Sequence, residues 1–222
     1  MIWSTHLAGG VQAGLAMVAI TNPEPHLAAI EIGSAMLGSV LPDIDKPGSK
    51  ITQKDYGLSL ISKVISKFTK HRRATHTIWA AFLFGLFFFL LLKIATLGTI
   101  TGASVVLGLL VAILLDFLDL KIGIFAGIVT FYVVPYLDVI PQIKIDSNVA
   151  LICGMGIAIG CLVHMLYDTF NPQGIMWLHP YSKKRYHLMN IQVMSSSEKF
   201  FRVLMWLVVL AMLVVLSTTI FI

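Results

Sequence analysis

Long apolar runs limit what this 222-residue chain can fold into more than any other feature of its sequence. Residues 74–92, 149–170 and 200–222 each approach or exceed the ~20 mostly apolar residues with which a helix crosses the roughly 30 Å hydrocarbon core of a bilayer. Only 12% of the residues are charged and 57% are hydrophobic, against about 25% and 45–50% in soluble domains. This composition excludes a soluble nucleic-acid-binding module, a disordered chain and a disulfide scaffold. We therefore expect an integral membrane protein.

Shorter apolar segments complete the predicted bundle. Residues 101–115 and 122–134 are interpreted as two spans joined by a tight polar turn. Residues 7–20 and 27–41 are separated by a turn with two prolines, which cannot continue a helix. The sequence predicts an all-α, polytopic membrane protein with about five full spans and a shorter N-terminal helical hairpin. We expect a single domain over residues 1–222.

Lysine and arginine are concentrated in two segments, which set the predicted orientation. Residues 42–73 contain eight of these basic residues and residues 171–202 contain five. Because cytoplasmic loops carry the excess of basic residues, loops at about 42–73 and 171–199 are predicted to face the cytoplasm. The net charge of +5 favours anionic lipid headgroups over nucleic acid as partners. Residues 58–69 are predicted to form an interfacial amphipathic helix.

Histidines and aspartates gather at the predicted cytoplasmic ends of the spans, where ionisable groups are rare and usually functional. His164 and Asp168 are four residues apart and share one helical face. Asp43 and Asp45 flank one residue and can point the same way in an extended loop. Imidazole with carboxylate is a ligand set for zinc and for harder divalent ions such as manganese. The predicted metal ligands are His6, Asp43, Asp45, His71, His76, His164 and Asp168, with His71 or His76, and Asp43 or Asp45, as alternatives.

Two glycine ridges indicate how the histidines meet. Glycines follow His6, and precede His164, at intervals of four residues; the ridges are Gly10 with Gly14 and Gly156 with Gly160. Ridges of small residues allow helices to approach closely in membranes. We expect the two helices to pack ridge against ridge, which would bring His6 close to His164 and Asp168.

Three spaced motifs carry a resemblance to a known family. They are Leu41-Pro-Asp-Ile-Asp-Lys-Pro-Gly-Ser49, His71-Arg-Arg-Ala-Thr-His-Thr77 and His164-Met-Leu-Tyr-Asp-Thr-Phe-Asn-Pro-Gln-Gly174, preceded by Thr5-His6. In this order they resemble the YdjM-type membrane-bound metal-dependent hydrolases, a family similar to the zinc-dependent phospholipase C and P1 nuclease superfamily. The resemblance implies that His164 and Asp168 hold one metal ion with Asp43 or Asp45 and one of His71 and His76. It also implies that His6 joins Asp168 at a second ion. Two or more divalent ions are expected, Zn²⁺ first and Mn²⁺ as the alternative.

The ligand set and the resemblance together predict a hydrolase of the bacterial cytoplasmic (inner) membrane, with its active site facing the cytoplasm. It is expected to act on a phosphoester of a lipid or lipid-linked substrate at the inner-leaflet interface. Adjacent divalent ions generate hydroxide at neutral pH for attack on phosphorus. Asp45 and Arg72 are the candidate catalytic residues. The candidate substrate-binding residues are Arg72, Arg73, Lys183, Lys184 and Arg185, all of which the positive-inside rule also explains.

Other functions remain open from the sequence. A metal-dependent amide or ester hydrolase would use the same ligands. A metal-ion or small-solute transporter would also place His and Asp within spans, but near the membrane midplane rather than at one end. A scaffold that binds anionic lipid through its basic loops is a third alternative.

Overall fold

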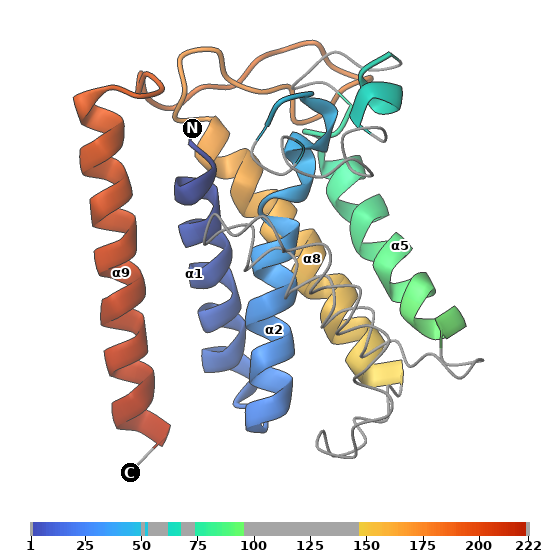
Figure 1. The fold of residues 1–222 in the computed structure, drawn as a ribbon, viewed down its shortest axis with the longest axis vertical. Coiled ribbons are helices and arrows are strands. Elements are labelled where there is room, and N and C mark those ends of the chain that lie inside the picture. The colour runs from blue at the N-terminus through green and yellow to red at the C-terminus, as the bar shows by residue number, and fades with distance from the viewer. Residues whose placement is uncertain (1, 50–51, 53–61, 68–73, 96–146, 221–222) are drawn as a thin grey trace.

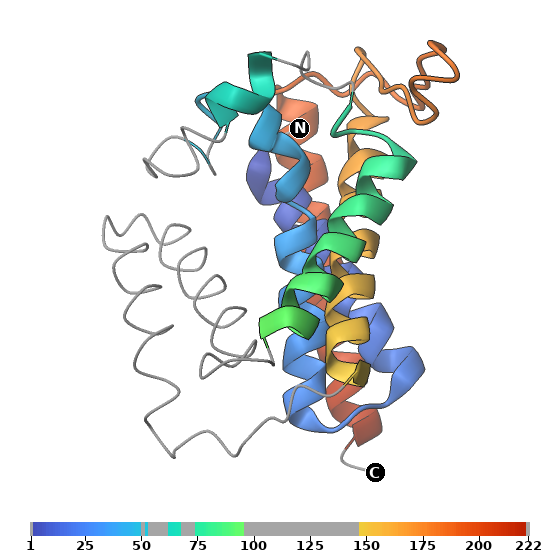
Figure 2. The ribbon, with the colours of Figure 1, turned by 90° about the vertical axis from the view of Figure 1, so that its right-hand side faces the viewer.

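The computed structural model describes residues 2–49, 52, 62–67, 74–95 and 147–220, and this part of the chain is a bundle of helices (Figure 1). The elements are α1 (Trp3–Thr21), α2 (Pro25–Gly38), the short 3-10 helix η1 (Leu41–Asp45), α5 (Ile78–Ala95), α8 (Ser147–Asp168) and α9 (Ser196–Ile220). Successive helices of the described part run in opposite directions, and their axes lie roughly along the long axis of the molecule (Figure 2). The predicted all-α class is confirmed for these residues.

Three helical segments in the described part are long and apolar enough to cross a membrane. They are Pro25–Asp45, Asn148–Asp168 and Ser196–Thr218. The first differs from the prediction of a short N-terminal hairpin, because Pro42 enters the first turn of η1 and the chain continues there as a 3-10 helix. The predicted spans at 101–115 and 122–134 lie outside the described residues, so the total of five spans stays a prediction.

The third predicted span begins later than its apolar pattern indicates. The span was predicted over residues 74–92, but α5 begins at Ile78 and its apolar part, Ile78–Lys93, is short for a span. Thr77 explains this start, since its hydroxyl accepts a hydrogen bond from the Ala80 N–H at 3.1 Å, as an N-capping residue does. Residues 62–67 are helical, within the amphipathic helix predicted at 58–69, whose other residues lie outside the described part.

Helix α8 lies at the centre of the bundle and contacts α1, α2 and α5. Its fully buried Ile157 and Met165 belong to the main apolar core, together with Leu37 of α2 and Leu92 of α5. Helix α9 is different, since only 6% of its span is buried. Its exposed apolar side chains are those expected of a helix that faces lipid.

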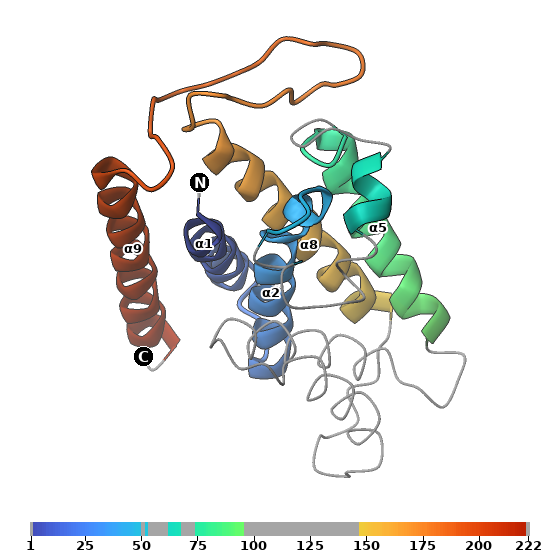
Figure 3. The same ribbon diagram turned by 45° about the horizontal axis from the view of Figure 1, so that its top comes forward.

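Helix α9 lies beside α1 (Figure 3), and its Phe201 also packs against Tyr167 of α8. The Glu198 carboxylate accepts hydrogen bonds from the backbone N–H groups of Ile2 and Met194. Ser195 caps the helix, because its hydroxyl accepts a bond from the Glu198 N–H at 3.2 Å. Further along, the Gln12 amide donates to the Met205 carbonyl at 2.8 Å. The start of α1, which carries His6, is therefore fixed to the start of α9.

The predicted packing of glycine ridge on glycine ridge is wrong. A Cβ on Gly10 would lie 2.8 Å from Cβ of Ser39, and one on Gly160 would lie 2.8 Å from the Ser39 backbone nitrogen. Gly14 and Gly156 likewise face residues of α2. Both ridges thus pack against α2, whose backbone lies between them. Direct contacts between α1 and α8 include one at Gly9, where a Cβ would lie 2.7 Å from the Tyr167 ring.

Candidate metal centre

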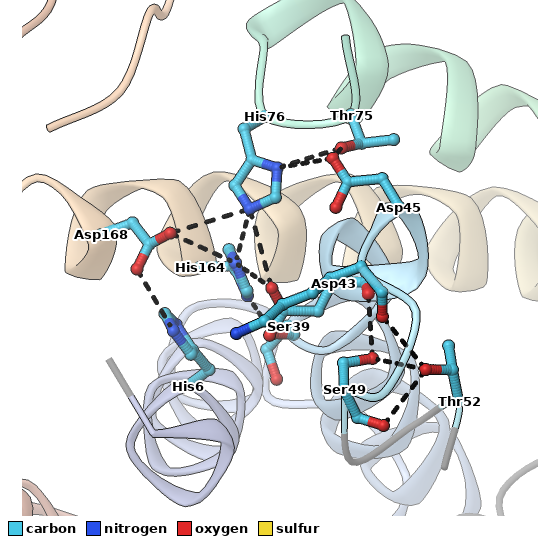
Figure 4. Close-up of polar contacts among 11 residues, drawn as sticks. His6, Ser39, Asp43, Asp45, Ser49, Thr52, Thr75, His76, His164 and Asp168 are labelled. Atoms are coloured by element: carbon cyan, nitrogen blue, oxygen red, sulfur yellow. Dashed lines mark hydrogen bonds and ion pairs between the residues drawn. The ribbon is translucent and has the colours of Figure 1, made fainter. Parts of the chain in front are cut away.

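Five of the predicted ligands meet at one end of the bundle, where α1 and α5 begin and η1 and α8 end (Figure 4). His6 comes from the first turns of α1, Asp43 from η1, His76 from the residues before α5, and His164 and Asp168 from the end of α8. Each of these elements alternates in direction with the next, so the five positions reach the same end. All except Asp43 are buried, and the Asp43 side chain is 21% exposed.

Four donor atoms surround one small volume. The Nε2 atoms of His76 and His164 are 3.2 Å apart. Asp43 Oδ1 lies 3.9 Å and 4.0 Å from these two nitrogens, and Asp168 Oδ2 lies 3.7 Å and 3.9 Å from them. Zinc ligands at about 2.0–2.1 Å in a tetrahedron are separated by roughly 3.3 Å. The separations measured from the two histidine nitrogens, 3.2–4.0 Å, are close to or somewhat above this spacing.

Hydrogen bonding fixes which ring nitrogens carry protons. His164 Nδ1 lies 2.7 Å from the Ser39 carbonyl oxygen, which can only accept, so Nδ1–H is the donor. The Thr75 hydroxyl donates to Asp45 Oδ2, and its oxygen therefore accepts from His76 Nδ1, 3.0 Å away. In the neutral imidazoles both Nε2 atoms then carry lone pairs, which face each other across 3.2 Å.

This donor set fits a cation. Two nitrogen lone pairs and two carboxylate oxygens converge in a buried volume, and buried charges are tolerated only when they are paired. A proton shared by His76 and His164 would place one positive charge beside two carboxylates. A divalent ion would supply two positive charges and could accept all four lone pairs, and the residues present are the borderline and hard ligands that Zn²⁺ and Mn²⁺ prefer.

A second group of donors adjoins the first through Asp168. His6 Nε2 lies 3.5 Å from Asp168 Oδ1, whereas Oδ2 of the same carboxylate faces His76 and His164. One ligand atom from each of His6, His164 and Asp168 falls within 4.8 Å of the others. The His6 ring stacks on His164 with centroids 3.8 Å apart, and its buried Nδ1 has no hydrogen-bond partner in the described part of the chain. The Asp168 carboxylate is thus shared between two clusters.

Asp45, predicted as a ligand or a catalytic residue, lies on the other side of the His76 ring. Its Oδ2 is 3.7 Å from His76 Nδ1, the nitrogen that faces away from His164. Between Asp43 and Asp45, the structure therefore places only Asp43 among the donors of the first cluster. Sequence reasoning left the two aspartates as alternatives, because the 3-10 turn that separates their side chains was not predicted.

The basic residues predicted to bind substrate fall into two groups. His71, Arg72 and Arg73 lie outside the described residues, so their positions stay predictions. Lys183, Lys184 and Arg185 lie in the exposed loop after α8, at the same end of the bundle as the cluster. The Arg185 guanidinium donates to the Gln173 carbonyl at 3.0 Å, and Lys184 lies 5.2 Å from the Tyr186 ring centre.

Sequence reasoning missed two residues that orient the ligands. The Ser39 carbonyl holds His164, but a backbone carbonyl leaves no signal in residue type. Thr75 holds His76, and its place directly before that histidine was a detectable signal. The loop after α8 also positions this segment, because the Ile78 N–H donates to the Trp177 carbonyl at 3.1 Å.

Membrane-length helices around a buried His and Asp cluster define an integral membrane protein with a candidate metal centre. Comparison with protein families matches residues 1–221 to the family described as YdjM inner membrane protein, and the chain belongs to that family. The comparisons with curated proteins and with solved structures find no match. The family resemblance drawn from the three motifs is confirmed, and the relationship to the phospholipase C and P1 nuclease superfamily stays a prediction.

Proposed function

We propose that this chain is a membrane-bound, metal-dependent hydrolase that acts on a phosphoester of a lipid or lipid-linked substrate. The observation that carries the proposal is the pair of histidine Nε2 lone pairs facing each other beside two carboxylates. Bound divalent cations would supply a nucleophilic water at neutral pH and neutralise charge on a phosphoryl group. Zn²⁺ is proposed first and Mn²⁺ second.

The residues divide into two proposed sites. Asp43, His76, His164 and one oxygen of Asp168 hold the first ion, and His6 with the other Asp168 oxygen contributes to the second. Neither cysteine of α8 competes for these ions. The Cys161 thiol, the nearer in sequence to His164, donates to the Gly38 carbonyl at 3.2 Å.

The direction of substrate approach follows from burial. Among the five donors Asp43 alone is partly exposed, so a phosphate is expected to enter on its side. The cluster lies at an end of the bundle rather than halfway along it (Figure 1), which suits a substrate whose headgroup lies at the membrane surface. The residues proposed to neutralise the phosphate are Arg72, Arg73, Lys183, Lys184 and Arg185. The positive-inside rule assigns this end to the cytoplasm.

Metal analysis with a hydrolysis assay tests the proposal. The full-length protein is purified in detergent beside His164→Ala, Asp168→Ala and the matched control His26→Ala, which changes an exposed histidine at the start of α2. Wild type and control should retain at least one equivalent of Zn²⁺ or Mn²⁺ and release phosphate or a phosphorylated headgroup from a panel of phospholipids and lipid phosphates. Both site variants should lose metal and activity.

Two results would contradict the proposed function. Equal metal content in all four proteins would contradict the proposed metal centre at His164 and Asp168. Metal bound by wild type but lost from the variants, without hydrolysis of any phosphoester in the panel, would favour a metal carrier or a hydrolase of amides or esters.

A further inference from the structure

The two ring nitrogens of His76 face different surroundings. Nε2 faces the candidate metal ligands, at 3.2 Å from His164 Nε2. Nδ1 faces the Thr75 hydroxyl at 3.0 Å and Asp45 Oδ2 at 3.7 Å. The Thr75 hydroxyl in turn donates to the same Asp45 oxygen. The His76 ring, the Thr75 hydroxyl and the Asp45 carboxylate therefore form a short buried network beside the first cluster of donor atoms (Figure 4).

We infer that Asp45 and Thr75 form a positioning pair for His76, and that Asp45 is not a metal ligand. The inference rests on the proposed metal site. The Asp45 carboxylate orients the Thr75 hydroxyl so that the hydroxyl oxygen accepts from Nδ1–H, which leaves the Nε2 lone pair directed at the metal. Outer carboxylates fix the ring orientation and tautomer of metal-binding histidines in the same way.

The geometry sets Asp45 apart from Asp43 although only one residue separates them. Asp43 Oδ1 approaches the two Nε2 atoms at 3.9 Å and 4.0 Å, whereas Asp45 approaches His76 from the Nδ1 side. Asp45 is 1% exposed, and the Asp43 side chain is 21% exposed. A carboxylate on the far side of the His76 ring, buried and accepting a hydroxyl proton, has the position of an orienting group rather than of a ligand.

The histidines of the first cluster are held by different means. His164 donates its Nδ1–H to the backbone carbonyl of Ser39, which no side-chain substitution removes. His76 depends on two side chains, so substitution can test this half of the site alone. Asp45→Asn keeps the shape of the side chain but removes its charge. Thr75→Val removes the hydroxyl, and Thr75→Ser keeps it.

The experiment measures metal affinity and metal stoichiometry separately, on the full-length protein with Zn²⁺ as the probe. Dissociation constants come from competition with a chromophoric chelator, and stoichiometry comes from metal analysis at saturating Zn²⁺. Asp45→Asn and Thr75→Val should each bind Zn²⁺ about 10- to 100-fold more weakly with unchanged stoichiometry. Thr75→Ser should bind nearly as tightly as wild type. The double variant should lose little more than the weaker single variant, because both changes act through one nitrogen.

Asp43→Asn is the matched comparison, since it removes a proposed ligand one residue away. It should alter the visible absorption of the Co²⁺-loaded protein, whereas Asp45→Asn should preserve the band shape because its ligands are unchanged. Thr75→Val loses a buried hydrogen bond and is expected to be less stable than wild type even without metal. Unfolding of the metal-free proteins therefore checks that each variant is folded, and the Co²⁺ spectrum separates positioning from a general structural role.

The outcomes distinguish this inference from the proposed function. Wild type that binds no metal overturns both. Wild-type affinity in Asp45→Asn and Thr75→Val overturns the positioning pair and leaves the metal site intact. Loss of an equivalent of Zn²⁺ from Asp45→Asn, with an altered Co²⁺ spectrum, makes Asp45 a ligand and also overturns the pair.

Discussion

Replacing Gly160 by alanine should weaken metal binding without touching any ligand. A Cβ at this position would lie 2.8 Å from the Ser39 nitrogen and 3.0 Å from the Ala35 carbonyl carbon, and closer still to the Ala35 oxygen. These are backbone atoms of α2, joined by the Ser39 N–H to Ala35 carbonyl hydrogen bond at 3.0 Å. No flexible side chain can move aside, so α2 itself must shift. The Ser39 carbonyl, which holds His164, moves with it.

The size of the effect follows from two contributions. Overpacking costs about 1–3 kcal/mol, and the greater helix propensity of alanine offsets about 1 kcal/mol of this. We expect a net loss of about 0–2 kcal/mol in the free energy of unfolding. Weakening the 2.7 Å bond from His164 to Ser39 removes about 0.5–1.5 kcal/mol of orienting interaction. At 1.4 kcal/mol for each factor of ten, the metal affinity should fall about 2- to 12-fold.

Gly85→Ala is the matched control for this prediction. Its Cβ would lie 2.6 Å from the Gly154 oxygen, so it overpacks the α5 and α8 contact in a comparable way, but its neighbours include no residue of the cluster. Zn²⁺ affinity by chelator competition and thermal unfolding in detergent are measured for both variants. Gly160→Ala should change affinity and stability, and Gly85→Ala stability alone. Wild-type affinity in Gly160→Ala despite lost stability would refute the coupling of α2 packing to His164.

Three further predictions concern the fold as a whole. Glu198→Ala should lower the unfolding free energy by about 2–5 kcal/mol, because two backbone N–H groups lose their acceptor; thermal unfolding measures this, and a change under 1 kcal/mol would contradict it. Removing metal with a chelator should lower the unfolding temperature reversibly, since an ion held at 100 times its dissociation constant adds about 2.7 kcal/mol; an unchanged temperature in a protein shown to lose metal would contradict this. Ile157→Ala, in the fully buried core, should cost about 2–5 kcal/mol. Leu213→Ala, on the exposed face of α9, should stay within about 0.5 kcal/mol in the same measurement, and equal losses would show that α9 is packed against protein.

The sequence predicted the parts of the fold that depend on residue type alone. Apolar length located α8 and α9, and the two prolines located the turn before α2. In the structure Asn22 adopts φ 44° in that turn and Pro25 begins the next helix. The start of α5 was placed at Ala74 instead of Ile78 because the uncharged side chains before Ile78 were counted with the apolar run, while a hydroxyl hydrogen bond of Thr77 caps the helix where it begins.

The packing partners of the helices were harder to predict, for a physical reason. A ridge of small residues shows that some backbone approaches closely, but it does not specify which one. Gly10 and Gly160 were expected to face each other and face α2 instead. The expected closeness of His6 and Asp168 is still found, at 3.5 Å between Nε2 and Oδ1. It arises because α1 and α8 both pack closely against α2.

The same limit explains why the candidate ligands were predicted better than the residues that orient them. A ligand set is visible in composition, since histidines and aspartates near apolar spans stand out wherever the chain folds them. Orientation depends on which lone pair or N–H each atom meets, and these partners include a backbone carbonyl at Ser39 and a hydroxyl at Thr75. The 3-10 turn places Asp43 with the Nε2 atoms and Asp45 on the Nδ1 side of one ring. Two aspartates that look equivalent in the motif are therefore expected to fail differently when substituted, one by losing a ligand and the other by weakening the hold on His76.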